Sequence, residues 1–137
     1  MVFTASTSLC SLSQNLGITA TGQTGLTLTA EIAYDGNWTA LFFGFYTENV
    51  WDRVLAASVD VTSGTTAIAP DTTGAPDEFH TVTVTGNLPS DSNPVRVFIG
   101  SSATPFSGGA GLNAKFAIDN VRATPPASKV EDWILFR

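Results

Sequence analysis

The sequence predicts an all-β fold, a two-sheet antiparallel β-sandwich, and three observations support this class. Only 13% of the 137 residues are charged, whereas nineteen are threonine and twelve are serine. Threonine is enriched in strands because its branched side chain packs well on a pleated surface. Apolar residues recur with period two in several short runs, and no window sustains the 3.6-residue period of a helix.

The most regular strand is predicted over residues 25–36 and ends in an Asp-Gly turn. One face of this strand carries Leu26, Leu28, Ala30, Ile32 and Tyr34. Residues 38–49 are apolar at both parities, which predicts a strand covered on both sides, by a second sheet and a loop or by another subunit. Gly44, in the centre of that run, marks a bend or a close backbone approach.

Further strands are predicted at 52–61, 79–89, 94–102, 115–123 and 130–136, with loops rich in Gly, Pro, Ser and Thr between them. Seven or eight short strands are typical of a sandwich with Greek-key or jelly-roll order. A chain of this length is most simply one domain. We therefore expect a β-sandwich over residues 1–126, with residues 127–137 as a C-terminal strand or docking tail of the same domain.

The last strand of the sandwich lies in "AKFAIDNVRATPP" and contains an irregularity. Phe116 and Ile118 share one face of an extended chain, but Val121 falls on the opposite parity. A β-bulge at Asp119–Asn120 would return Val121 to the core side. The two prolines that follow end the strand, because neither can donate a ladder hydrogen bond.

The stretch "PVRVFIGSSATPFSGGAGLNAKFAIDNVRATPP", residues 94–126, resembles the closing strand pair of β-jelly-roll modules. In such modules a strand of the type P-[VL]-x-[VI]-x-[IL] leads through a Gly/Ser loop to F-x-I-D-N-V-R. They include non-catalytic carbohydrate-binding domains and domains of bacterial cell-surface proteins. The resemblance implies a jelly-roll-like sandwich and leaves the function open, since sandwiches with this ending carry many activities.

The resemblance also implies a structural calcium ion near the acidic residue of the last strand, here Asp119. Calcium takes six to eight oxygen ligands, and Glu31 on an early strand is the one partner that the sequence suggests. The alternative interpretation is that Asp119 bonds backbone groups at its own bulge, as Asp does in irregular backbone. No other cofactor is expected.

Charge and hydropathy argue against two classes of partner. The formal net charge is −6, and the six basic residues are scattered along the chain, so they form no stripe for phosphates. No segment approaches the roughly 20 apolar residues that cross a bilayer. We therefore expect neither a nucleic acid nor a membrane as partner.

We also expect no catalytic activity. His80 is the only histidine, so a Ser-His-Asp triad would depend on it alone, and its place in an alternating strand predicts a satisfied core or edge histidine. Glu48 and Asp52 flank Trp51, but glycosidase carboxylates stand about 5–10 Å apart across a cleft, which a hairpin end rarely makes.

The tryptophans are the better functional indication. A tryptophan near a strand end can stack on a sugar or anchor a protein interface, and core packing is the alternative for each. Trp38 and Trp51 are the candidates for glycan stacking. The candidates for protein binding are Trp51 and the C-terminal residues Trp133, Ile134, Leu135 and Phe136.

Two function hypotheses follow. The first is a structural assembly protein, an accessory decoration or cement subunit of a viral (phage) capsid, which contacts itself or the major capsid protein through β edges and termini. The chain starts at Met1 and has no basic n-region or continuous apolar h-region, so it is expected to be made in the host cytoplasm and located in the virion. The second is a glycan-binding module of an extracellular or cell-surface protein, for which the chain would be a processed fragment.

Overall fold

The computed structural model describes residues 2–4, 11–20, 24–73, 75–89, 93–101 and 114–124. The predicted strand at 130–136 and the whole predicted tail lie outside these residues. The described strands are β1 (Val2–Thr4), β2 (Ser11–Thr19), β3 (Leu26–Tyr34), β4 (Phe42–Glu48), β5 (Arg53–Asp60), β6 (His80–Gly86), β7 (Pro94–Gly100) and β8 (Lys115–Thr124). One turn of 3-10 helix, η1 (Gly64–Thr66), follows β5.

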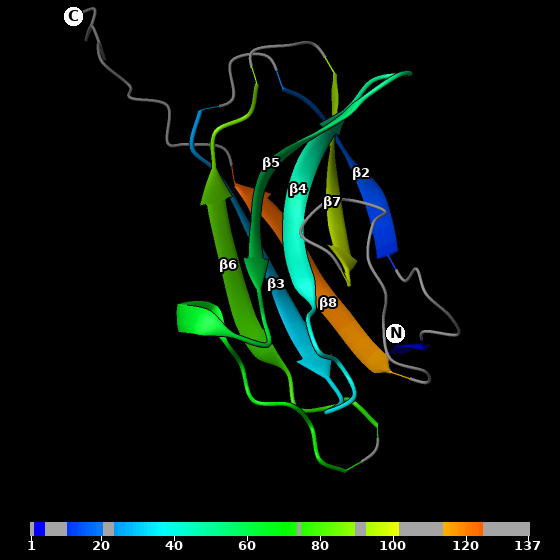
Figure 1. Cartoon of the computed structure of the whole chain (residues 1–137). Coiled ribbons are helices and arrows are strands. Elements are labelled where there is room, and N and C mark those ends of the chain that lie inside the picture. Colours follow the sequence, from blue (N-terminus) through cyan, green and yellow to red (C-terminus); the bar gives the residue numbers. More distant parts are fainter. Residues whose placement is uncertain are drawn as a thin grey trace, which may run out of the picture.

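The strands form two four-stranded antiparallel sheets that pack face to face (Figure 1). One sheet has the order β1-β8-β3-β6, and the other has the order β2-β7-β4-β5. This pair of orders is that of an eight-stranded jelly roll, in which two Greek keys are wrapped together. The predicted all-β sandwich with jelly-roll-like order is therefore confirmed. The part of the chain that the structure describes contains no helix long and apolar enough to cross a membrane.

The core lies between the inner faces of the sheets, and the alternation predicted for β3 determines which face is buried. All five residues of the predicted apolar face of β3 are buried, whereas Thr27, Thr29 and Glu31 between them are partly exposed. Each fully buried large apolar side chain contributes roughly 1.5–3 kcal/mol. A one-residue slip of β3 would exchange the two faces, so this pattern fixes the register.

Strand β4 is buried on both of its faces, as its two-sided apolar pattern predicted. Phe43 and Phe45 belong to the core between the sheets. Tyr46 points to the opposite face and meets Phe98 of β7 edge-on, with ring centroids 5.9 Å apart. Gly44 has no room for a side chain, because a Cβ there would overlap the Ala57 carbonyl oxygen. The predicted close backbone approach is confirmed.

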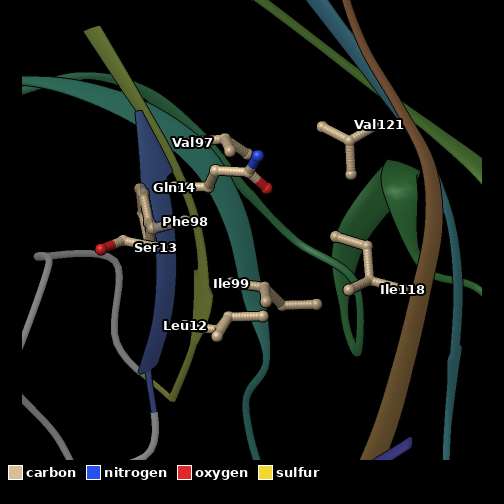
Figure 2. A pocket seen from close by; sticks show the side chains of 8 residues that line it. All are labelled: Leu12, Ser13, Gln14, Val97, Phe98, Ile99, Ile118 and Val121. Atoms are coloured by element: carbon tan, nitrogen blue, oxygen red, sulfur yellow. The ribbon is translucent and has the colours of Figure 1, made fainter. Parts of the chain in front are cut away.

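The predicted bulge in β8 is confirmed and lies one residue further along the strand than expected. Glu31 stands opposite Asp119 and Thr29 opposite Arg122, so Asn120 and Val121 together face the single residue between them on β3. Asn120 has a φ of 48°, in the left-handed region, where Asn is one of the few residues tolerated. Val121 consequently points to the same side as Ile118 (Figure 2).

Strands β1 and β2 were not predicted from the sequence. The signal for β2 was present but weak: Leu16 and Ile18 pack against the core, and polar residues alternate with them. Serines and a glycine dilute this pattern. In addition, a register shift after Asn15, with Gly17 at φ 73°, interrupts the ladder between β2 and β7.

Candidate functional site

The β4–β5 hairpin ends in a tip, residues 48–53, that presents two large apolar side chains to solvent. The side chain of Trp51 is 92% exposed and that of Val50 is 86% exposed. Scattered surface hydrophobic residues need no explanation, but two adjacent ones at the end of a hairpin form a projecting apolar knob. We call this pair the hairpin knob.

The backbone beneath the hairpin knob is fixed by Asn49. The Asn49 side-chain oxygen accepts hydrogen bonds from the backbone N–H groups of Trp51 and Asp52, both at 2.7 Å. The Asn49 N–H in turn donates to the Asp52 carbonyl at 3.0 Å. Asn is favoured at such turns because its side chain imitates a backbone acceptor. The turn therefore holds its shape without any packing of the Trp51 ring.

The base of the tip is closed by ion pairs of Glu48. One carboxylate oxygen lies 2.8 Å from Arg53 Nε and the other lies 2.5 Å from Arg96 Nε. The Asp52 carboxylate accepts the Arg53 N–H at 2.8 Å. Partly exposed pairs of this kind add about 1 kcal/mol or less to stability, but they orient both acids. Glu48 and Asp52 thus have their partners at the hairpin base and on β7.

Trp38 was predicted as a glycan-stacking residue, and this prediction is wrong. Its side chain is only 6% exposed, its Nε1–H donates to the Lys115 carbonyl at 2.8 Å, and its ring meets Phe116 edge-on at 5.8 Å. Strand β4 begins at Phe42, later than expected, so Trp38 lies in the connection between β3 and β4, and its side chain belongs to the core. Of the two stacking candidates, Trp51 alone is exposed.

Glu31 and Asp119, the two acids predicted to meet, stand opposite each other on β3 and β8. The Asn120 N–H donates to the Asp119 carboxylate at 2.8 Å, and the Asn120 side-chain amide donates to Glu31 at 2.7 Å. Asp119 therefore has the bulge-bonding role of the second interpretation. Among the described residues, no group of three or more His, Cys, Asp or Glu side chains is placed to hold a metal ion.

His80 begins the edge strand β6 and pairs with Ile32 of β3. It is half-buried, and within the described part of the chain its Nε2 atom finds no hydrogen-bond partner. The expected edge position is confirmed, and the expected hydrogen-bonded state is not. The C-terminal candidates Trp133, Ile134, Leu135 and Phe136 lie outside the described residues.

A buried acid that was not predicted from the sequence, Asp71, organises the loop before β6. The Asp71 carboxylate accepts hydrogen bonds from the Thr73 hydroxyl and N–H and from the N–H groups of Asp77 and Glu78. These bonds hold the pKa of Asp71 well below its usual range. The same carboxylate, through its hydrogen bond and then its charge, raises the pKa of Asp77. Four donors on one carboxylate indicate a structural role for Asp71 in this loop. The sequence signal for this role is the run Asp-Thr-Thr at residues 71–73.

A second surface feature lies on the flank of the sandwich where β2 and β8 form the rims. A cavity of about 200 Å³ opens there between the sheets. Figure 2 shows Ile118 and Val121 on one wall, facing side chains of β2 and β7 across the gap. The lining residues are Leu12, Ser13, Gln14, Val97, Phe98, Ile99, Ile118 and Val121. We call this feature the flank groove.

No protein-family model matches this sequence, and no curated protein does.

Proposed function

We propose that this chain is a non-catalytic structural assembly protein, an accessory decoration or cement subunit of a viral capsid, and that it docks on its protein partner by the hairpin knob. The observation that carries this proposal is the exposure of Trp51 at 92% beside Val50 at 86%, on a turn that is already ordered by its own hydrogen bonds.

The energetics of such a contact are favourable. A tryptophan buries roughly 150–250 Å² when it enters a pocket, which at about 25 cal/mol per Å² gives about 5 kcal/mol before the costs of association. The preformed turn reduces those costs, because little backbone must be ordered on binding. Tryptophan is also among the residues that most often dominate an interface.

The capsid assignment rests on the architecture together with the surface chemistry. Eight-stranded jelly rolls are used both by viral capsid subunits and by lectins, so the fold agrees with either function. The low proportion of charged residues and the net charge of −6 suit a subunit that covers a protein shell rather than one that contacts the packaged nucleic acid.

A glycan-binding module is the second candidate, and a specific observation favours it. Beside Trp51 lies a hollow of about 350 Å³ that is otherwise lined by Glu48, Asn49, Val50, Asp52 and Arg53. Amide, carboxylate and guanidinium groups next to an aromatic ring can bond the hydroxyls of a sugar that stacks on that ring. On this hypothesis the same tip binds a polysaccharide in place of a protein.

Photo-crosslinking from position 51 tests the proposal. A benzophenone amino acid replaces Trp51 in one variant and the exposed Thr81 of β6 in the control, and both are irradiated in the cells that produce the chain. We expect a covalent product with a capsid protein from position 51 and none from position 81. Retention of the wild type on polysaccharide, lost in Trp51→Ala, with no protein product would overturn the capsid proposal in favour of the glycan one.

A further inference from the structure

Within the described part of the chain, strand β8 has an unpaired edge over most of its length. Strand β1 pairs with β8 only along Lys115–Ala117, whereas β8 continues to Thr124. Among the described strands, β3 is the one that pairs with β8 beyond this point. The backbone of residues 118–124 therefore presents ladder donors and acceptors along its free edge.

The flank groove adjoins this free edge. Ile118 and Val121 of β8 face Leu12 and Ile99 across it (Figure 2), and Leu12 and Val121 are each 38% exposed. Backbone hydrogen-bonding groups beside an apolar wall are what an added strand requires, because the ladder supplies affinity and alternate side chains fill the wall. The flank is thus suited to an extended apolar segment.

We propose that this flank receives the C-terminal segment of a second copy of the chain, residues 130–136, as a strand added antiparallel to β8. The segment "VEDWILF" has seven residues, as many as the unpaired stretch 118–124. With the two bulge residues of β8 opposite one residue of the segment, Asp132 lies beside the exposed Arg122, Trp133 beside Val121 and Leu135 beside Ile118. Opposite charges and apolar side chains are both matched in this register.

The sequence between β8 and this segment favours exchange between copies over folding back on the same copy. Pro125 and Pro126 follow β8 directly, and proline keeps the residue before it extended. Two residues in polyproline geometry carry the chain about 6 Å beyond the end of the strand. Residues 127–129 alone remain for a reversal onto the same copy, which favours insertion of the segment into the flank of a neighbour.

The exchange is reciprocal, because each copy offers one segment and one flank. Two copies can therefore close a symmetric dimer in which both flanks are filled, as in domain swapping. The contact involves neither Val50 nor Trp51. It is consequently a second interaction surface, and its failure would leave the docking by the hairpin knob untouched.

The experiment is the sedimentation of the full-length chain over a range of concentrations. We expect a dimer for the wild type, and dimerisation at least about tenfold weaker, equivalent to 1.4 kcal/mol, for Val121→Glu in the groove and for Trp133→Glu in the segment. Val54→Glu on β5 is the matched control, since Val54 is also 38% exposed, and it should dimerise as the wild type does. If the circular dichroism spectrum shows that Val121→Glu does not fold, Arg122→Glu, at an exposed position, is measured in its place.

Mixing the Val121→Glu and Trp133→Glu variants tests the proposal independently of folding defects, because two misfolded variants would not restore each other's dimerisation. The Val121→Glu copy keeps an intact segment and the Trp133→Glu copy keeps an intact flank, so an equimolar mixture should form heterodimers through one of the two contacts. A monomeric wild type at the highest concentration reached, an undiminished dimer of Val121→Glu, or a mixture no more associated than its components would each overturn the proposal. A monomer whose segment is protected from protease only while Val121 is present would assign the segment to its own flank.

Discussion

Glu31 and Asp119 stand directly opposite each other in the β3–β8 ladder, and Asn120 donates a hydrogen bond to each of them. Like charges placed opposite each other on a sheet destabilise it. The Asn120 amide and N–H offset that repulsion, and the left-handed backbone of Asn120 directs both donors toward the carboxylates. The polar cluster at the bulge is thus centred on Asn120 rather than on either acid.

Two substitutions of Asn120 distinguish the contribution of its side-chain hydrogen bond from that of its left-handed backbone. Asn120→Gly keeps the left-handed backbone at no steric cost and loses the hydrogen bond to Glu31, so we expect a loss of about 1 kcal/mol in the free energy of unfolding. Asn120→Ala adds the left-handed penalty of roughly 1–2 kcal/mol. Urea unfolding measures both. An alanine variant as stable as the glycine variant would show that the backbone conformation at the bulge is not held as described.

Asp71 makes a pH-dependent contribution to stability. Its folded-state pKa is lowered, first by its hydrogen bond from the Asp77 N–H, so its ionised form stabilises the fold. That contribution is complete above about pH 4, near the unfolded pKa, and is lost as the pH falls through the folded pKa. The raised pKa of Asp77 acts in the opposite sense and offsets part of it.

The corresponding variant is Asp71→Asn, with Asp52→Asn at the exposed hairpin as control. We expect Asp71→Asn to melt below the wild type at pH 7 and the gap to narrow steadily as the pH is lowered below 4. Thermal melts recorded across this range by circular dichroism give the comparison. A gap that stays constant with pH would mean that the charge of Asp71 is not what the four donors stabilise.

Gly36 and Gly44 should respond differently to substitution by alanine. A Cβ at Gly44 would overlap the Ala57 carbonyl oxygen and lie 2.8 Å from the Ser58 Cα, whereas a Cβ at Gly36 would meet nothing within 4 Å. Overpacking of this kind costs about 1–3 kcal/mol or more, so Gly44→Ala should unfold at clearly lower denaturant. Gly36→Ala should remain close to the wild type. Equal midpoints for the two variants would contradict the close approach of β4 and β5.

Substitution of Trp38 should lower the stability of the fold, whereas substitution of Trp51, the proposed binding residue, should leave it nearly unchanged. Trp38→Ala removes a buried ring and its hydrogen bond to Lys115, with an expected cost of about 3–5 kcal/mol. Trp51→Ala removes a side chain that contacts almost nothing, so the free energy of unfolding should change by less than about 0.5 kcal/mol. Denaturant titration monitored by circular dichroism avoids the loss of fluorescence in both variants. A large loss of stability in Trp51→Ala would mean that its ring packs within the domain.

The sequence predicted the fold class because the apolar alternation in β3 and β6 and the two-sided burial of β4 are local patterns with direct structural consequences. It missed β2, where serines replace apolar residues and a register shift interrupts the ladder. It placed the bulge in β8 within one residue, since a change of parity between Ile118 and Val121 needs an extra residue. The order of the strands could not be predicted from local sequence patterns, because the packing of the whole core decides which distant strands pair.

The candidate site was predicted in part. Trp51 was identified because it lies near a strand end, but the same reasoning failed for Trp38, whose side chain belongs to the core. The pairing of Glu31 with Asp119 was anticipated, whereas the bridging role of Asn120 was not. The flank groove could not be foreseen, because it arises from the shortness of β1 relative to β8.

The central claim, that the hairpin knob docks on a capsid, is tested most directly by density-gradient sedimentation of particles from cells that produce the chain. We expect the wild type and Val54→Ser to sediment with the particles, and Trp51→Ser, folded normally by circular dichroism, to remain at the top of the gradient. Sedimentation of Trp51→Ser with the particles at the wild-type level, or a wild type that never sediments with them, would contradict the claim.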